Sequence, residues 1–503
     1  MTAQNELKRL SNQILVNGEF RDSAATDGLD VIDPATEEVI GRMPFTTAAE
    51  VDEAIAVANS TQKAWNKVNA LTRAELLHQV ATRMRELNAI MGEMLTREMG
   101  KTYKETTDEI EWAATSIDYY AEVARHDYGK VVGPAVDNQF HFTLKEPMGV
   151  VVIILPFNFP FCLLCWSAAA ALATGNAVIV KPSENTALST LKFMEAFAAL
   201  PDGLMQCLPG GGEVGRQLVE STDTHAVAFT GSVPTGQIVA RACADQFKPC
   251  LIEASGNDPF LVMPSAPIDM AARGGAFAAY LNCGQVCTSA ERFFVHEAVY
   301  DEFVAKMIVN SQALRIGNGL DKVDMGPMVS ASERDRYEAI LQRAIDQGSS
   351  VASGGGRPAE MDKGWFVEAT VLTGVDPGME IMNEESFGPS APICKVSSLD
   401  EAIELANKSR FGLGSTIYTT DLDEAMRAVN EIETGMVWVN APLLDNDAGP
   451  FGGRKMTGMG RQLGAEGLDT FRHTKLAMID PGANNQDFWW FPYKDSELFP
   501  GSK

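Results

Sequence analysis

The sequence predicts an α/β protein built on a mostly parallel, doubly wound sheet. Between residues 149 and 256, short apolar runs alternate with helical stretches. The first run, GVVVIILP, is continuously apolar, as in strands that are buried on both faces. A second stretch of the same alternation runs from about Asp258 to about Gly458. Strands that alternate with helices indicate a parallel sheet, and such sheets bind ligands at the carboxyl ends of their strands.

The expected elements follow one another in order. Residues 48–127 have a helical pattern, and residues 128–147 mix apolar residues with turn formers, as in a short antiparallel excursion. The parallel stretch then reads as strand GVVVIILP, helix CLLCWSAAAALATG, strand AVIVKP, helix TALSTLKFMEAFAAL, strand GLMQCLPG, helix EVGRQLVES, strand AVAFTG, a further helix and strand KPCLIEAS. Near the end, TFRHTKLAMID is predicted to be a returning strand. The aromatic QDFWWFPYKDSELFPGSK is predicted to pack on a partner subunit.

Composition narrows the choice of partners and compartment. The chain has 503 residues and a formal net charge of −26. Nucleic acids and anionic membranes bind basic surfaces, so neither is expected as a partner. The excess acid could attract cationic small molecules, or it could be a plain solvated surface. Eight cysteines are too few for a disulfide framework, and the N-terminus lacks an apolar signal segment, so a cytoplasmic protein is expected.

Two cysteines, Cys283 and Cys287, stand four residues apart in LNCGQVCTSAER. The sparse cysteine content disfavours a disulfide between them. The six histidines are scattered without an acidic cluster, so no metal site is predicted. Cys162 and Cys165 spell C-x-x-C at the start of an apolar helix without a second pair, and are predicted to belong to the core.

Two glycine-rich turns follow predicted strands. Gly210, Gly212 and Gly215 spell G-x-G-x-x-G between a strand and a helix, which is a weak dinucleotide signal on its own. In FTGSVPTG, Gly231 and Ser232 end a strand directly before a helix, where backbone N–H groups and a hydroxyl can bind phosphate. Together the two turns favour a dinucleotide ligand.

Seven motifs occur along the chain in the order LPFNFP, KPSE, FTGS, EASG, GQVC, EESFGP and PFGGRKMTGMGR. In this order they resemble the motifs of the aldehyde dehydrogenase superfamily, from about residue 12 to about residue 480. The resemblance implies an aldehyde dehydrogenase-like fold and a homodimer or homotetramer. Its expected parts are a Rossmann-like NAD-binding domain (1–127 and 148–256), an α/β catalytic domain (257–457), and a small oligomerisation hairpin with the C-terminal tail (128–147 and 458–503).

The resemblance also implies catalytic roles. Cys287 matches the nucleophile of the G-Q-x-C motif, and its thiolate would attack an aldehyde to form a thiohemiacetal. Asn158 matches the family's oxyanion donor, joined by the Cys287 backbone N–H. Loss of hydride leaves a thioester, and Glu253 matches the general base that activates water to hydrolyse it. Cys283, one helical turn earlier, is predicted to pack.

The same resemblance implies NAD as the cofactor. Lys181 and Glu184 match residues at the adenosine ribose, where a carboxylate repels a 2′-phosphate, so NADP is less favoured. Ser232 matches the pyrophosphate contact, and Glu385 and Phe387 match the residues at the nicotinamide ribose and ring. The predicted cofactor-binding residues are Leu155, Lys181, Ser183, Glu184, Gly215, Phe229, Gly231, Ser232, Glu385 and Phe387.

Three positions depart from the family pattern. Ser255 replaces a glycine near the nicotinamide, Ser167 stands where a lysine is usual, and Gln462 replaces a glutamate. In the family the last two positions are associated with proton exit from the general base. We therefore expect a different proton route or slower hydrolysis, with activity retained.

The residues expected around the substrate tunnel combine carboxylates with aromatic rings. Asp108, Glu111, Trp112 and Thr115 share one helix face by their spacing, and Asp445 precedes the PFGG motif. This combination suits an ammonium group, so the hypothesis is a cationic aminoaldehyde or betaine aldehyde. The alternative is a solvated acidic helix face. The predicted tunnel residues are Asp108, Glu111, Trp112, Phe159, Trp166, Asp445 and Phe451.

Three other functions stay open. A CoA-acylating dehydrogenase would transfer the acyl group to CoA, although Glu253 favours water. The substrate could also be a neutral aliphatic or aromatic aldehyde. The third alternative is a catalytically silent binding protein on the same fold, which the presence of Cys287, Asn158 and Glu253 disfavours.

Overall fold

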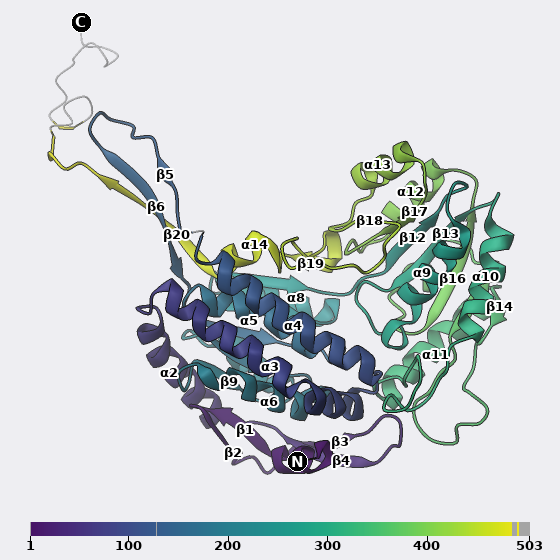
Figure 1. Ribbon diagram of the computed structural model, residues 1–503, viewed down its shortest axis with the longest axis horizontal. Helices are drawn as coiled ribbons and strands as arrows, with labels where there is room; N and C mark the ends of the chain where they lie inside the picture. The colour runs from purple at the N-terminus through teal and green to yellow at the C-terminus, as the bar shows by residue number, and fades with distance from the viewer. Residues whose placement is uncertain (1, 127, 485–489, 492–503) are drawn as a thin grey trace, which may run out of the picture.

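The computed structural model describes residues 2–126, 128–484 and 490–491, and two large sheets form its two halves (Figure 1). The first sheet has eight strands. In spatial order these are β19 (Gly458–Met459), β11 (Cys250–Glu253), β10 (Ala226–Thr230), β7 (Val150–Ile154), β8 (Ala177–Lys181), β9 (Met205–Cys207), β1 (Gln13–Val16) and β2 (Glu19–Asp22).

The central strands of this sheet confirm the predicted α/β class. β7, β8, β9, β10 and β11 pair in parallel, and the residues of β7 and β8 are almost entirely buried, as their apolar sequences predict. The chain runs outward from β7 through β8 to β9, and then returns to β10 on the other side of β7. The connections that leave β7 and β10 therefore diverge, and a ligand crevice forms at such a point.

Helices cover both faces of the first sheet. α5 (Pro160–Ala173) and α6 (Ala187–Met194) connect β7 to β8 and β8 to β9, and the long helices α3 (Ala70–Met99) and α4 (Tyr103–Val123) pack over them. Right-handed crossovers place α7 (Gly212–Glu220) and α8 (Val233–Ala244) on the opposite face. α2 (Ala48–Trp65) packs with α7, and α1 (Ala3–Leu10) packs with α3 and α6.

The second sheet begins directly after the first one ends. In spatial order its strands are β14 (Ser350–Ser353), β15 (Thr370–Thr373), β16 (Ser390–Val396), β13 (Ala290–His296), β12 (Asp258–Val262), β17 (Thr416–Tyr418) and β18 (Trp438–Val439). Its helices are α9 (Ile268–Tyr280), α10 (Tyr300–Gln312), α11 (Ala331–Asp346), α12 (Leu399–Asn407) and α13 (Leu422–Glu431). Only four residues separate β11 from β12, so the edges of the two sheets are held close together.

A third, smaller sheet projects away from both large ones (Figure 1). β5 (Val131–Val132), β6 (Phe140–Pro147) and β20 (Arg472–Ile479) form it, which confirms the antiparallel excursion and the returning strand. The assignment of all of 458–503 to this region needs correction, because β19 completes the first sheet and α14 (Gly464–Asp469) packs on α5. Apart from residues 490–491, the aromatic segment predicted to pack on a partner lies outside the described residues.

The first 47 residues carry strands that the sequence pattern did not reveal. β1 and β2 extend the first sheet as an antiparallel edge, and β3 (Gly28–Ile32) pairs with β4 (Val39–Pro44). β2, β3 and β4 are short and mostly half-buried or exposed, so neither an alternating nor a continuous apolar run marks them, and the buried apolar run of β1 is only three residues long. No helix within the described ranges combines the length and the apolar character needed to cross a membrane.

Glu98, a buried carboxylate on α3, caps α6. It accepts hydrogen bonds from Leu188 N (2.8 Å) and Ser189 N (2.7 Å), and α6 has no side-chain cap at its own N-cap residue, Thr186. We expect Glu98→Ala to destabilise the protein by about 2–4 kcal/mol, because two buried N–H groups lose their acceptor. Chemical denaturation measures the loss. Glu86→Ala on the exposed face of α3 is the control, and an equal effect of both variants would contradict the capping role.

Candidate active site

Three chain segments meet where the two sheets approach each other. Asn158 lies between β7 and α5, Glu253 ends β11, and Cys287 lies between α9 and β13. All three line one cavity of about 340 Å³. The backbone makes this meeting close, because a Cβ at Gly256 would lie 1.9 Å from the carbonyl oxygen of Cys287. Only glycine allows the two backbones to approach so closely.

The segment that leads to Cys287 is not helical. α9 ends at Tyr280, and Asn282 and Cys283 then adopt left-handed conformations with φ of 50° and 57°. The expectation that Cys283 lies one helical turn before Cys287 is therefore wrong. Cys283 is buried with its Sγ 3.7 Å from the Met328 Sδ, and Cys162 and Cys165 are buried in α5, as predicted for packing cysteines.

Burial controls the protonation of the thiol and the carboxylate. Glu253 is 3% exposed, and burial raises its pKa to about 7. One carboxylate oxygen, Oε2, lies 3.5 Å from the Thr230 hydroxyl, whereas Oε1 has no hydrogen-bond partner among the described residues. Burial and the neighbouring Glu253 charge raise the pKa of the Cys287 thiol well above its usual value. The unpartnered Oε1 can therefore accept a proton from a group that enters the cavity.

The 340 Å³ cavity extends from these residues along the carboxyl end of β10. Gly231, Ser232, Glu385 and Phe387 line it, and Ser232 is the N-cap of α8. Glu385 Oε1 accepts a hydrogen bond from Gly256 N at 2.9 Å, and burial together with the charge of Glu291 raises the Glu385 pKa to about 8. Four of the predicted cofactor residues thus share one cavity.

The other predicted cofactor residues lie at the ends of neighbouring elements. Lys181 ends β8, and its Nζ pairs with Glu184 Oε1 at 2.9 Å, with Ser183 between them at the start of a short 3₁₀ turn. Leu155 follows β7 and is buried. The buried ring of Phe229 packs under the glycine that follows its strand, Gly231. Gly215 faces Ile154 across the start of α7, at van der Waals distance from where a Cβ would stand.

Further cavity residues had not been predicted, among them Thr230 and Arg336. Thr230 is the last residue of β10 and directly precedes the Gly231–Ser232 turn. Its position at the carboxyl end of a predicted strand is the signal from which it could have been predicted. Arg336 of α11 donates hydrogen bonds to the backbone oxygens of Glu385 and Ser386 at 3.3 and 3.1 Å. The sequence of α11 does not indicate that Arg336 contacts the site, because the contact joins residues about fifty positions apart.

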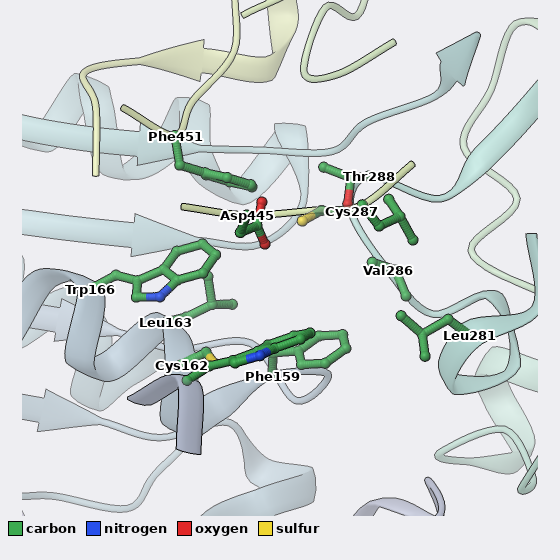
Figure 2. A pocket seen from close by; sticks show the side chains of 12 residues that line it. Phe159, Cys162, Leu163, Trp166, Leu281, Val286, Cys287, Thr288, Asp445 and Phe451 are labelled. Carbon is green, nitrogen blue, oxygen red and sulfur yellow. The ribbon is translucent and has the colours of Figure 1, made fainter. Parts of the chain in front are cut away.

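A second, mostly apolar pocket also reaches Cys287, and we call it the inner pocket (Figure 2). The Asp445 carboxylate points into it among aromatic rings, and the rings of Trp166 and Phe451 lie 4.8 Å apart. Asp445 is exposed, yet the surrounding protein and the charge of Asp447 raise its pKa to about 7. The lining residues are Trp112, Phe159, Cys162, Leu163, Trp166, Leu281, Val286, Cys287, Thr288, Leu443, Asp445 and Phe451.

A larger outer cavity of about 640 Å³ shares Trp112, Phe159 and Leu281 with the inner pocket. Asp108 lines this outer cavity and pairs with Lys104, and Arg273 lines it as well. Its charge is therefore mixed. Glu111 pairs instead with Arg85 on the exposed side of α4, at 2.9 Å. The residues predicted to share one face of α4 therefore separate. Trp112 lines both the inner pocket and the outer cavity, Asp108 lines the outer cavity, and Glu111 lies at the surface.

The two unusual neutral residues meet in the structure. Gln462 Nε2 donates a hydrogen bond to Ser167 Oγ at 2.8 Å, and both residues are buried. The contact is a neutral amide–hydroxyl pair where a lysine and a glutamate are usual in the family. Ser255, the third departure, lines the cavity of Glu253 and hydrogen-bonds Glu385. No cluster of three or more His, Cys, Asp or Glu residues suited to a metal ion occurs in the described part of the chain.

Comparison with known proteins agrees with this architecture. The model of the aldehyde dehydrogenase family matches residues 20–477. The chain is 35% identical to 3,6-anhydro-alpha-L-galactose dehydrogenase of Vibrio sp. (strain EJY3), over 93% of this chain and 99% of that protein. It is 34% identical to betaine aldehyde dehydrogenase of Brucella canis, over 93% and 97% of the two chains. Betaine aldehyde dehydrogenase of Staphylococcus aureus, solved with NAD⁺, superposes with a TM-score of 0.93 at 30% identity, over 97% and 98% of the two chains. This chain belongs to the aldehyde dehydrogenase family and is an oxidoreductase that acts on aldehydes.

Proposed function

We propose that the protein oxidises an aldehyde to a carboxylic acid through a thioester on Cys287. The observation that supports this most directly is that Cys287, Asn158 and Glu253 line one cavity, with the Glu253 Oε1 unpartnered within the described residues. A second pocket reaches the same residue. The aldehyde and the cofactor can therefore approach Cys287 through different cavities.

Each residue has a defined part in this proposal. The Cys287 thiol gives up its proton to solvent as its sulfur adds to the aldehyde carbon, and the resulting oxyanion accepts hydrogen bonds from the Asn158 amide and the Cys287 N–H. No hydrogen bond within the described residues occupies the Asn158 side chain, so its amide is available. After the thioester forms, ionised Glu253 takes a proton from water, which attacks the thioester carbonyl and releases the acid.

We propose NAD as the cofactor, and the residues present fit a dinucleotide. The N-terminus of the twelve-residue helix α8 and the Gly231–Ser232 turn can bind the pyrophosphate. Glu385 and Phe387 line the part of the cavity near Cys287, and Lys181 and Glu184 lie at the end of β8 for the ribose. When bound, the nicotinamide supplies the hydride acceptor. The solved anhydrogalactose relative, described as a complex with NAP, shares the fold with a TM-score of 0.90.

We also propose a homodimer or homotetramer in a reducing compartment. The projecting sheet has exposed apolar side chains on β5, β6 and β20, including Val131, Phe140 and Met478. Projecting apolar strands favour association with a second copy. All eight cysteines are free thiols, which fits the cytoplasm.

The preferred substrate is a cationic aldehyde, such as an aminoaldehyde or betaine aldehyde. Asp445 supports this choice, because one carboxylate stands among the rings of Trp112, Phe159, Trp166 and Phe451. Carboxylates and aromatic faces both attract an ammonium group. Similarity to betaine aldehyde and aminoaldehyde dehydrogenases points the same way. A neutral aldehyde is the second candidate, since the pocket is otherwise apolar and the anhydrogalactose enzyme is also a relative.

The first prediction concerns Glu253. We expect turnover to rise with pH through about 7, because Glu253 acts as a base only when it is ionised. In Glu253→Gln, the first turnover should still release NADH in a burst, while steady-state turnover falls by roughly 10²–10³-fold and loses the rise near pH 7. Stopped-flow absorbance between pH 5.5 and 9 measures both phases. Loss of the burst itself would show that Glu253 acts before the thioester, and Cys287→Ala controls for background reaction.

The second prediction concerns the substrate. Betaine aldehyde should give a higher kcat/KM than hexanal or succinic semialdehyde, and NADH should form without CoA. Asp445→Asn should lower kcat/KM for betaine aldehyde about tenfold, or ~1.4 kcal/mol, because it removes the charge that attracts the ammonium group; the loss is modest because solvent screens an exposed carboxylate. The KM of the wild type for betaine aldehyde should fall as pH rises through about 7, where Asp445 ionises.

The control for this series is Asp447→Asn, on the same loop but outside the lining of the inner pocket. It should keep the preference for betaine aldehyde and move the fall of KM to a lower pH, because the charge of Asp447 no longer raises the Asp445 pKa. A higher kcat/KM for hexanal would reject the cationic substrate in favour of the neutral one. A requirement for CoA would reject hydrolysis by water.

A further inference from the structure

Lys101, in the turn between α3 and α4, is fully buried next to the proposed oxyanion residue. Its ammonium group pairs with the equally buried carboxylate of Glu109. It also donates a hydrogen bond of 2.7 Å to the backbone oxygen of Asn158 and lies 4.0 Å from the centre of the Phe159 ring. Three different partners on two chain segments thus surround one buried charge.

Glu109 connects this charge to the start of α5. Its Oε1 accepts hydrogen bonds from Phe161 N at 2.7 Å and from Cys162 N at 3.2 Å, in the first turn of that helix. α5 has no side-chain cap of its own, since Phe159 occupies the N-cap position. The Lys101–Glu109 pair therefore holds the main chain on both sides of Phe159, immediately after Asn158.

A third charged residue, Glu105, holds the segment that precedes Cys287. Glu105 accepts a hydrogen bond from Asn282 N at 2.8 Å, where the backbone is left-handed. The Asn282 side chain in turn lies 3.5 Å from the Asn158 backbone oxygen. Glu105 and Glu109 are four residues apart on one side of α4, and Lys101, just before the helix, pairs with Glu109.

We propose that Lys101, Glu105 and Glu109 are positioning residues that set the oxyanion hole between Asn158 and Cys287. Taking charges out of water is costly, and a buried pair is stable only when further hydrogen bonds satisfy both groups. Here the groups that hydrogen-bond to the buried charges are backbone atoms of the Asn158 segment and of the segment that precedes Cys287. The inference rests on the proposed roles of Asn158 and Cys287.

Loss of these contacts should reduce the rate of catalysis rather than the affinity for NAD. Oxyanion donors must be held within a fraction of an ångström, and a displacement of about 1 Å can reduce the rate about 10²-fold. None of the three charged residues lines the 340 Å³ cavity that we propose for NAD, here called the NAD cavity, and Ser232 and Glu385, which are proposed to bind NAD, lie on other segments. Breaking the Lys101 contacts should therefore lower kcat while NAD affinity is kept.

The test is a double-mutant cycle between Lys101→Met and Asn158→Ala in the full-length enzyme. Lys101→Met should reduce kcat/KM about 10²-fold in the wild-type background and less than about twofold in the Asn158→Ala background, because Lys101 acts through Asn158. NAD binding, followed by fluorescence, should stay within about twofold. Glu109→Gln keeps an acceptor oxygen for α5 and should give a smaller loss of kcat/KM with the same dependence on Asn158. It replaces Lys101→Met in the cycle if that variant does not fold.

The matched control is Lys192→Met. Lys192 is also a buried lysine in an ion pair, with Glu6 at 2.8 Å, but it joins α6 to α1 and lines neither the inner pocket nor the NAD cavity. Both methionine variants should lose similar thermal stability, and only Lys101→Met should lose turnover. Equal turnover in the two variants, or losses that simply add in the cycle, would overturn the positioning role.

The same experiment separates this inference from the proposed function. If the wild type oxidises no aldehyde, or Asn158→Ala is as fast as the wild type, the proposed function is wrong and the positioning role falls with it. If Asn158→Ala slows the enzyme but its loss adds to that of Lys101→Met, only the positioning role is wrong.

Discussion

The close approach of the Gly256 backbone to the Cys287 carbonyl is the constraint on which the site depends. A side chain at position 256 would place its Cβ 1.9 Å from that oxygen. The chain crosses here from the first sheet to the second, between the end of β11 at Glu253 and the start of β12 at Asp258. Main-chain contact between the two halves therefore holds the carboxylate of one beside the thiol of the other. Both cavities open at this junction because Cys287 lines each of them.

Buried acid gives this junction its chemical character. Burial raises the pKa of Glu253 to about 7, the surrounding protein and the Asp447 charge raise that of Asp445 to about 7, and burial with the Glu291 charge raises that of Glu385 to about 8. Burial and the Glu253 charge raise the pKa of the Cys287 thiol well above its usual value. The site therefore holds protons near neutral pH that it can release to solvent or substrate. Each proton that leaves adds a negative charge, so the cavities attract positive charge more strongly as pH rises.

Helix α4 shows where interpretation of the sequence reached its limit. The spacing of Asp108, Glu111 and Trp112 drew attention to one face of the helix, but Glu111 pairs with Arg85 at the surface. The charged residues that contact the site, Lys101, Glu105 and Glu109, belong to another side and were not singled out. Charged residues at helical spacing are usually solvated, and only their burial against distant backbone reveals a different role. The neutral pair of Ser167 and Gln462 likewise joins positions 295 residues apart.

The sequence by itself determined the α/β class, the order of the central strands and helices, and the family, because apolar runs and motifs are local patterns that need no neighbours. It also located the cysteine motif and the strand-end turns that we propose to bind the cofactor. Only the tertiary structure decided that Cys283 leaves the helix, that 458–469 joins the first half of the molecule, and which acids face the pockets. Those outcomes depend on burial and on contacts between distant segments, and a linear pattern does not contain either.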